Sequence, residues 1–204
     1  MADIVTGLLS RYPLISDQVD KQQVELILRE LEKVCIYGAE GAVVEFGCYT
    51  GTTSLFIRRL LDTHSPARAF HVYDSFEGLP AKSTWDASAT GEAFTAGELA
   101  VSKKLFLREF HRAHLHPPVV HKGWFKDLTA GDVPDKIAFA FLDGDFYESI
   151  RDSLRLVLPR LQPGGTIIVD DYSREALPGV ARAVHEHFRP ETITTRHNLA
   201  VIHS

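Results

Sequence analysis

Four aspartates in the C-terminal half of the chain have the residue type and spacing to do chemistry together. They are Asp143, Asp145, Asp170 and Asp171. The first pair follows the apolar run 137–142, and the second pair follows the run 166–169. Such runs are typical of strands buried on both faces, and open α/β sheets bind ligands at the carboxyl ends of their parallel strands. The spacing therefore predicts that up to four carboxylates meet at one edge of a sheet.

Three interpretations of these aspartates compete. Each aspartate could cap the helix that follows it, because Asp is favoured near helix starts. The group could instead hold Mg²⁺ or Ca²⁺, which prefer oxygen ligands, and no His or Cys accompanies it. One member could also act as a general acid or base. Several like charges at one edge repel unless a cation or protons compensate them, so we favour a metal site that includes a base.

A second candidate site is the turn in the segment 42–54. An apolar run there ends in Glu45, and a turn with the spacing Gly47-x-x-x-Gly51 leads into a helical pattern. Glycines let the backbone approach a ligand, and the helix N-terminus offers free N–H groups. The spacing is not the G-x-G-x-x-G of dinucleotide dehydrogenases, and Glu45 would repel a pyrophosphate. The turn suits a cationic ligand such as a sulfonium or an amine, with a tight turn that binds nothing as the alternative.

A third acidic position follows the apolar segment 67–73. Asp74 lies about 30 residues after Glu45, near the place where nucleotide-binding α/β folds hold ribose hydroxyls with an acid. A simple turn residue is the alternative. Together with the glycine turn, the position favours contact with a ribose.

The elements that must position these residues alternate between strand and helix. Helical patterns fall at 21–37, 98–114, 147–161 and 178–188, and strand patterns at 42–46, 67–73, 119–124, 137–142, 166–169, 192–194 and 199–202. This order predicts a parallel sheet with right-handed crossovers, finished by an antiparallel hairpin at its edge. We expect a single domain over residues 1–204, in which residues 1–41 form an N-terminal helical cap.

The segment 81–97 is small and polar, and Trp85 and Phe94 are the only large apolar residues that could anchor it. A long loop in a compact domain is usually functional or disordered. We expect a mobile active-site lid, with a merely flexible insertion as the alternative.

Composition narrows the classes of partner. The chain has 204 residues, is 45% hydrophobic and carries a net charge of -5, with no basic block that would favour nucleic acid. Cys35 and Cys48 lack metal or redox spacing and suit a reducing compartment. We see neither a signal peptide nor an apolar run of roughly 20 residues that could cross a bilayer. We therefore expect a soluble, cytoplasmic protein that binds neither nucleic acid nor membranes.

Five segments of the sequence resemble the macrocin O-methyltransferase family of class I S-adenosylmethionine-dependent enzymes. They are 44–51, 73–80, 121–125, 142–149 and 163–172. The strings Asp-Ser-Phe-Glu-Gly-Leu-Pro and Leu-Asp-Gly-Asp-x-Tyr-Glu-Ser are much more specific than the glycine turn. The resemblance implies a Rossmann-like fold with a mostly parallel seven-stranded sheet, an antiparallel C-terminal edge and helices on both faces.

The same resemblance implies an activity and a set of site residues. The activity is Mg²⁺-dependent transfer of a methyl group from S-adenosylmethionine to a hydroxyl of a small molecule, a sugar or vicinal diol of a secondary metabolite. The implied metal ligands are Asp143, Asp170 and Asp171, with Asp145 or Asp143 as general base. The implied cofactor-binding residues are Glu45, Gly47, Tyr49, Thr50, Gly51, Thr52, Thr53, Ser54, Asp74, Ser75, Gly123, Trp124 and Asp143. Family habit and exposed helix faces also suggest a homodimer.

Other functions stay open at this point. A catechol-type O-methyltransferase would use the same metal logic on an aromatic acceptor, and a relative that binds the cofactor without turnover would keep the same fold. An NAD-dependent dehydrogenase is disfavoured by the glycine spacing and by Glu45. Phe146 and Ile150 stand where the family often has other side chains, and the N-terminal segment and the lid look short. These departures leave the acceptor undefined.

Overall fold

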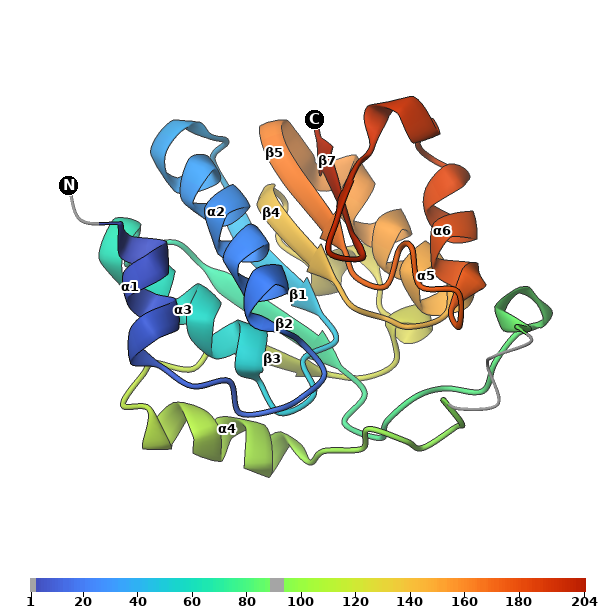
Figure 1. Cartoon of the computed structure of the whole chain (residues 1–204), viewed down its shortest axis with the longest axis horizontal. Helices are drawn as coiled ribbons and strands as arrows, with labels where there is room; N and C mark the ends of the chain where they lie inside the picture. The colour runs from blue at the N-terminus through green and yellow to red at the C-terminus, as the bar shows by residue number, and fades with distance from the viewer. Residues whose placement is uncertain (1–2, 89–93) are drawn as a thin grey trace.

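The computed structural model describes residues 3–88 and 94–204, which form a central sheet with helices on both faces (Figure 1). The strands are β1 (Ala42–Phe46), β2 (Phe70–Asp74), β3 (Val119–Lys122), β4 (Ile137–Leu142), β5 (Leu161–Val169), β6 (Thr194–Arg196) and β7 (Leu199–His203). The helices are α1 (Ile4–Arg11), α2 (Lys21–Tyr37), α3 (Thr52–His64), α4 (Lys103–Arg112), α5 (Tyr147–Val157) and α6 (Pro178–His185). Five short 3-10 turns complete the structure: η1 (Thr84–Asp86), η2 (Phe125–Asp127), η3 (Ala130–Asp132), η4 (Leu158–Arg160) and η5 (Pro190–Thr192).

The sheet has the strand order β3-β2-β1-β4-β5-β7-β6. Its first five strands are parallel, and β7 runs antiparallel to both β5 and β6. The predicted fold class and the predicted antiparallel edge hairpin are therefore confirmed. The chain moves outward from β1 to β3 and then returns to place β4 on the other side of β1. Ligands of open α/β sheets bind where the strand order reverses in this way.

Two apolar layers hold the helices against the sheet. Alternate strand residues point to opposite faces, so Val43 packs with α1 to α4 while its neighbour Val44 packs with α5 and α6. The apolar stripe predicted for 21–37 lies in the first layer, and α2 has the predicted extent. Both faces are covered, which explains why β4 is apolar throughout and entirely buried.

Several boundaries differ from the sequence-based expectation. The helix expected over 98–114 is shorter, because Leu99 has a positive φ of 59° and Ser102 caps α4 by accepting a hydrogen bond from Leu105 N–H. Helix α5 ends at Val157, where η4 leads directly into β5. In the N-terminal part, α1 and α2 lie within residues 1–41, of which residues 1 and 2 are outside the described part of the chain; the division into one domain with a helical cap stays a prediction.

The proposed lid, 81–97, includes residues 89–93, which lie outside the described residues. The described part has an unexpected anchor in addition to Trp85 and Phe94, whose rings lie against the guanidinium groups of Arg182 and Arg174. Asp86 is completely buried, whereas Trp85 remains 46% exposed. A buried carboxylate, absent from the sequence-based expectation, therefore ties this segment to the body of the protein. Among the described helices, none is both long and apolar enough to span a bilayer.

Gly47 sets how closely β1 approaches β4 beside the candidate site. Its φ is 88°, and a Cβ atom at this position would overlap the carbonyl oxygen of Asp143. The exposed Gly97 has a similar φ of 86° but nothing within 4 Å of such a Cβ. A substitution at Gly97 therefore measures the free-energy cost of the left-handed conformation alone, whereas one at Gly47 adds the cost of the overlap with Asp143.

We expect Gly97→Ala to lower the free energy of unfolding by about 1–2 kcal/mol, the usual cost of a left-handed non-glycine residue. Gly47→Ala adds a backbone overlap and should lower it by about 4 kcal/mol or more. Urea unfolding of both variants measures the difference. Equal losses would show that β1 and β4 can separate freely at this point.

Candidate active site

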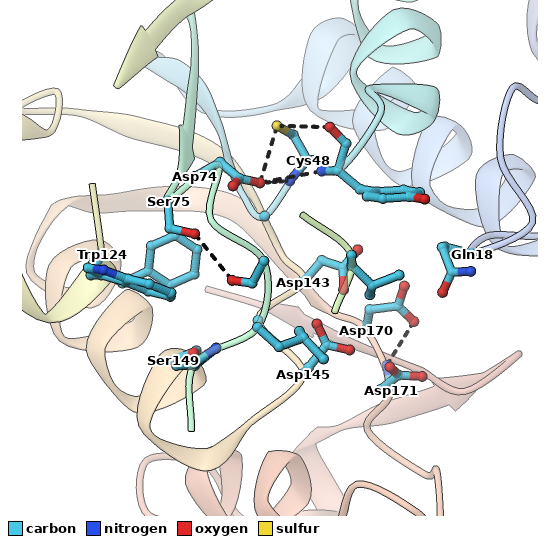
Figure 2. A pocket seen from close by; sticks show the side chains of 18 of the residues that line it. Gln18, Cys48, Asp74, Ser75, Trp124, Asp143, Asp145, Ser149, Asp170 and Asp171 are labelled. Atoms are coloured by element: carbon cyan, nitrogen blue, oxygen red, sulfur yellow. Dashed lines mark hydrogen bonds between the residues drawn. The ribbon is translucent and has the colours of Figure 1, made fainter. Parts of the chain in front are cut away.

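A cleft with an internal volume of about 100 Å³, open to solvent, lies at the carboxyl ends of the parallel strands (Figure 2). Its lining from the strand ends and the loops that follow them comprises Gly47, Cys48, Tyr49, Asp74, Ser75, Gly78, Leu79, Pro80, Trp124, Phe125, Asp143, Gly144, Asp145, Asp170, Asp171 and Arg174. The remaining lining residues are Gln18, Leu99 and, from α5, Ser149. The cleft therefore occupies the place where the strand order reverses.

Asp74 ties the end of β2 to the glycine turn. Its Oδ2 accepts hydrogen bonds from the backbone N–H groups of Cys48, at 2.9 Å, and of Tyr49, at 3.3 Å. Its Oδ1 accepts one from Phe76 N–H at 2.6 Å. Figure 2 shows this carboxylate at the upper wall of the cleft. Asp74 thus shapes the turn and also faces the space where we expected a ribose.

Glu45 lies beneath the turn and does not line the cleft. Its side chain is completely buried; Oε2 accepts a hydrogen bond from Ser54 Oγ, and Oε1 has no hydrogen-bond partner. Burial, with a smaller contribution from the nearby Asp74 charge, raises the pKa of Glu45 to about 8, although the hydrogen bond from Ser54 favours the ionised form. Glu45 therefore connects β1 to the first turn of α3.

The predicted cofactor-binding residues divide into two groups. Those that line the cleft are Gly47, Tyr49, Asp74, Ser75, Trp124 and Asp143. Those that do not are Glu45, Thr50, Gly51, Thr52, Thr53, Ser54 and Gly123. The second group shapes the surroundings: Gly51 packs against the ring of Phe106, and the hydroxyls of Thr52 and Ser16 lie 2.7 Å apart.

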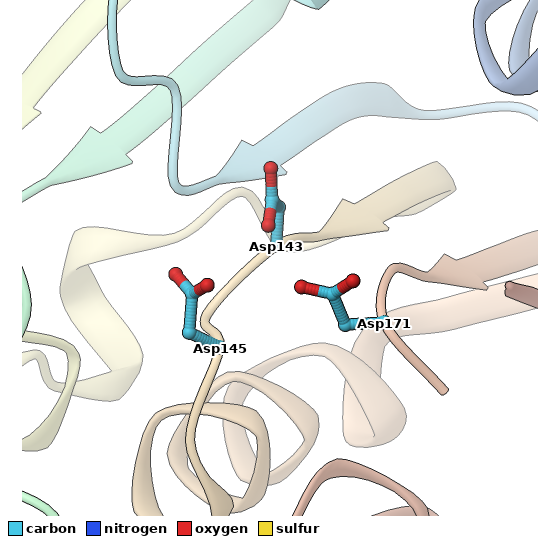
Figure 3. Close-up of side chains that lie close together, drawn as sticks. All are labelled: Asp143, Asp145 and Asp171. Carbon is cyan, nitrogen blue, oxygen red and sulfur yellow. The ribbon is translucent and has the colours of Figure 1, made fainter. Parts of the chain in front are cut away.

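Three of the predicted aspartates form a tight cluster (Figure 3). Asp143, Asp145 and Asp171 each offer one carboxylate oxygen, and these oxygens all lie within 4.8 Å of one another. The first two follow β4 and the third follows β5, which is paired with β4 in parallel. Asp171 is buried, and the other two are half-buried in the cleft.

Asp170 lines the cleft but is engaged elsewhere. Its Oδ1 accepts hydrogen bonds from Gln23 Nε2, at 3.1 Å, and from Asp171 N–H, at 2.7 Å. Gln23 belongs to the capping box that starts α2, so this contact links the N-terminal region to the carboxylate edge. The closest group of three therefore contains Asp145 in addition to Asp143 and Asp171, whereas the predicted ligand set contained Asp170.

Burial raises the pKa of all four aspartates, and repulsion from neighbouring carboxylates raises it further in Asp143, Asp145 and Asp170. The pKa of Asp143 lies well above its usual range, mainly because of burial and then because of the Asp170 charge. Burial also raises the pKa of Asp145 to about 7 and that of Asp170 to about 8. Arg174 donates a hydrogen bond to Asp171 at 2.9 Å and offsets part of the charge. Protons or a cation are needed to balance the negative charge of the cluster that Arg174 does not offset.

Several lining residues were not predicted. Arg174 could have been found from the sequence, because it follows Asp171 by three positions, a spacing at which it forms an ion pair with Asp171. No sequence pattern points to Gln18 or Leu99, because they reach the cleft from segments far away in the sequence. Phe125 follows the predicted Trp124 directly and packs edge-on against Phe46 at 5.3 Å between ring centroids.

The strand order, with its antiparallel β7, and the cleft at the β1–β4 reversal define a Rossmann-like fold of the class I methyltransferase type. The chain belongs to the macrocin-O-methyltransferase (TylF) family, whose sequence model matches residues 14–201. The family resemblance noted from the sequence is thereby confirmed.

Named relatives come from actinomycetes. The chain is 38% identical over 164 residues to 8-demethyl-8-(2,3-dimethoxy-alpha-L-rhamnosyl)-tetracenomycin-C 4'-O-methyltransferase of Streptomyces olivaceus, covering 77% of this chain and 61% of the relative. It is 34% identical over 158 residues to mycinamicin III 3''-O-methyltransferase of Micromonospora griseorubida, covering 74% and 61% respectively. The matched region thus spans about three-fifths of the length of these relatives.

A solved structure supports the same fold. The O-methyltransferase NovP superposes with a TM-score of 0.79 at 29% sequence identity, covering 91% of this chain and 80% of NovP. The calicheamicin methyltransferase CalS11 superposes with a TM-score of 0.76 at 19% identity, which shows the shared fold alone.

The buried Glu45 makes stability depend on pH. Between its unfolded pKa of about 4.3 and its folded pKa of about 8, the folded protein holds a proton that the unfolded chain has released. This stabilisation is fully present below about pH 4.3 and is lost as pH rises through about 8. Glu45→Gln cannot titrate, so its stability relative to wild type should increase with pH.

We expect this gain to reach a few kcal/mol between about pH 5.5 and 8.5, as measured by urea unfolding. The clustered aspartates titrate in both proteins, so the difference between the two isolates Glu45. Glu148→Gln, at an exposed position, is the control and should track wild type at each pH. A constant difference between Glu45→Gln and wild type would show that Glu45 is ionised in the folded protein.

Proposed function

We propose that this chain transfers a methyl group from S-adenosylmethionine to a hydroxyl group of a small molecule, with Mg²⁺ held by the clustered aspartates. The observation that carries the proposal is the group of three carboxylates in the same cleft as the glycine turn and Asp74. The names of the relatives support a sugar-bearing secondary metabolite as acceptor, since one names a rhamnosyl group.

The wall formed by the glycine turn suits the cofactor. Gly47 lets the turn lie directly against the Asp143 backbone at the cleft, Asp74 offers carboxylate oxygens to ribose hydroxyls, and the Trp124 ring offers an apolar face for the adenine. When bound, S-adenosylmethionine supplies a methyl group already activated by its sulfonium. The enzyme then has to orient an oxygen nucleophile and exclude water.

The aspartate cluster suits a hard divalent cation. Its donors are all carboxylate oxygens, and burial first and then mutual repulsion raise the pKa of Asp143 and Asp145, so a bound cation would stabilise their charged forms. In this proposal Asp143 and Asp171 hold the metal, and Asp170, oriented by Gln23, supports them from the adjacent position. When bound, Mg²⁺ would acidify an acceptor hydroxyl and fix its direction.

Asp145 is the better of the two predicted candidates for general base. Its pKa of about 7 lies near neutral pH, where a base is most effective. Asp143 has a more strongly raised pKa, and its backbone N–H is bonded to the Phe46 carbonyl of β1 at 2.8 Å, which suits a fixed ligand. Asp145 would therefore accept the proton that the acceptor hydroxyl loses. The cytoplasmic location, the homodimer and the lid role of 81–97 stay predictions.

Calorimetric titration tests the cofactor and the metal together. We expect saturable binding of S-adenosylhomocysteine and then of Mg²⁺, with at least about tenfold weaker Mg²⁺ binding in Asp143→Asn and in Asp171→Asn. Glu148→Gln, an exposed change close to the site, should bind both as wild type does. Binding of S-adenosylhomocysteine without Mg²⁺ would reject the metal role, and transfer to a diol panel would then separate an active enzyme from a non-catalytic relative.

Replacement of Asp145 tests its role as base. We expect Asp145→Asn to lower kcat by about 10²–10⁴-fold while affinity for S-adenosylhomocysteine stays within about twofold. The variant should be at least as stable as wild type, because it removes repulsion from the cluster. Asp135→Asn, at an exposed position, serves as the control. A normal kcat in Asp145→Asn would exclude Asp145 as the base.

A further inference from the structure

Asp86 is a completely buried carboxylate in the segment that the sequence predicted to be a lid. Aspartate is rarely fully buried unless its oxygens are paired. Here Oδ2 accepts hydrogen bonds from Ser83 N–H, at 2.9 Å, and from Ser83 Oγ, at 2.6 Å. Oδ1 accepts a third from Tyr147 N–H at 2.7 Å. The last bond joins two segments that are far apart in the sequence.

Tyr147 is the first residue of α5, so Asp86 occupies the position of a helix cap. The residue that precedes the helix, Phe146, provides no capping side chain. A carboxylate at a helix N-terminus satisfies a free N–H group and interacts favourably with the helix dipole. Asp86 therefore caps α5 from a distant segment.

Asp86 also touches the beginning of α6. A Cβ atom at Gly179, in the first turn of α6, would overlap Asp86 Oδ1. The residue that precedes α6, Leu177, likewise makes no capping hydrogen bond. Helices α5 and α6 lie side by side (Figure 1), and each one follows a loop that carries clustered aspartates. One carboxylate thus lies between the starts of both helices.

The link between this cap and the cleft is short. Asp145 lies two residues before Tyr147 and has a φ of 58°, a left-handed conformation that is unfavourable for a non-glycine residue. Such a conformation persists only when its surroundings hold it in place. The cap at Tyr147 N–H holds one end of this turn, and the bond from Asp143 N–H to the Phe46 carbonyl, at 2.8 Å, holds the other.

Neighbouring contacts attach the same segment to α6. The guanidinium of Arg182 lies 3.5 Å from the ring centroid of Trp85, and the Trp85 ring lies 6.0 Å from that of Tyr147. Ser88 Oγ donates a hydrogen bond to the Glu175 carbonyl at 3.0 Å. Residues 83–88 are therefore attached at several points around the Asp86 carboxylate.

We propose that Asp86 is a positioning residue that caps α5 from the segment 83–88 and thereby holds the turn that carries Asp143 and Asp145. Its effect on catalysis rests on the proposed function, whereas its effect on the turn does not. Asp86 is not a catalytic residue, because it does not line the cleft and its oxygens are engaged with Ser83 and Tyr147.

The chain contains a matched control for this test. Asp132 accepts hydrogen bonds from Thr129 N–H and Oγ1, at 2.7 Å and 2.6 Å, in the same arrangement as Asp86 and Ser83. The Asp132 side chain is exposed, and no bond from it to another helix is observed within the described residues. Asp132→Ala therefore removes an equivalent local turn contact without removing a distant cap.

Hydrogen exchange of the peptide 143–150 should be followed in Asp86→Ala, Asp86→Asn and Asp132→Ala. We expect the Tyr147 amide to exchange about tenfold or more faster in Asp86→Ala and to be unchanged in Asp132→Ala. Asp86→Asn keeps one acceptor oxygen and should fall between them. If Asp86→Ala does not fold, the comparison of Asp86→Asn with Asp132→Ala decides the question. Unchanged exchange in folded Asp86 variants would overturn the proposal.

Kinetics then tests the consequence for the site. We expect kcat to fall by about tenfold or more in Asp86→Ala while affinity for S-adenosylhomocysteine stays within about twofold, because the Asp74 wall is not touched. A parallel loss of both would indicate a general structural role and overturn the positioning role. If wild type transfers no methyl group and binds no Mg²⁺, the proposed function fails, and hydrogen exchange still decides whether Asp86 holds the turn.

Discussion

Repulsion among clustered carboxylates is the constraint on which the rest of the site depends. Asp143, Asp145 and Asp171 lie close together, and burial raises the pKa of each of them. A folded chain can keep such a group only if its backbone is held firmly and its charge is compensated. Arg174 and protons compensate part of the charge in the protein alone, and a divalent cation would do so more completely.

The backbone around this group is held from several directions. The Asp143 carbonyl lies where a side chain at Gly47 would be, so β1 and β4 approach closely beside the cleft. Gln23 orients Asp170 from the start of α2, and Asp86 binds the start of α5. The strand ends thus place the aspartates at the edge of the sheet, and contacts from segments distant in the sequence hold their side chains and backbone in position. The glycine turn with Asp74 forms a separate wall of the same cleft.

Much of the fold could be predicted from local patterns. The apolar run of β4 and the helical stripe of α2 have clear periodicities, and their alternation along the chain implies a parallel sheet. The start of α4 was misjudged, because the positive φ of Leu99 has no signature in its residue type. Asp86 was overlooked because a polar residue in a polar loop looks exposed until its partner, Tyr147, is known.

The sequence by itself determined that Asp143, Asp145, Asp170 and Asp171 end neighbouring strands, because the length of an apolar run and the residue after it are local properties. Only the tertiary structure decided which oxygens meet: Asp145 joins the cluster, Asp170 turns toward Gln23, and Glu45 lies below the cleft. The physical reason is that side-chain direction depends on partners from other elements, such as Gln23, which lies 147 positions from Asp170, and local spacing does not encode these partners.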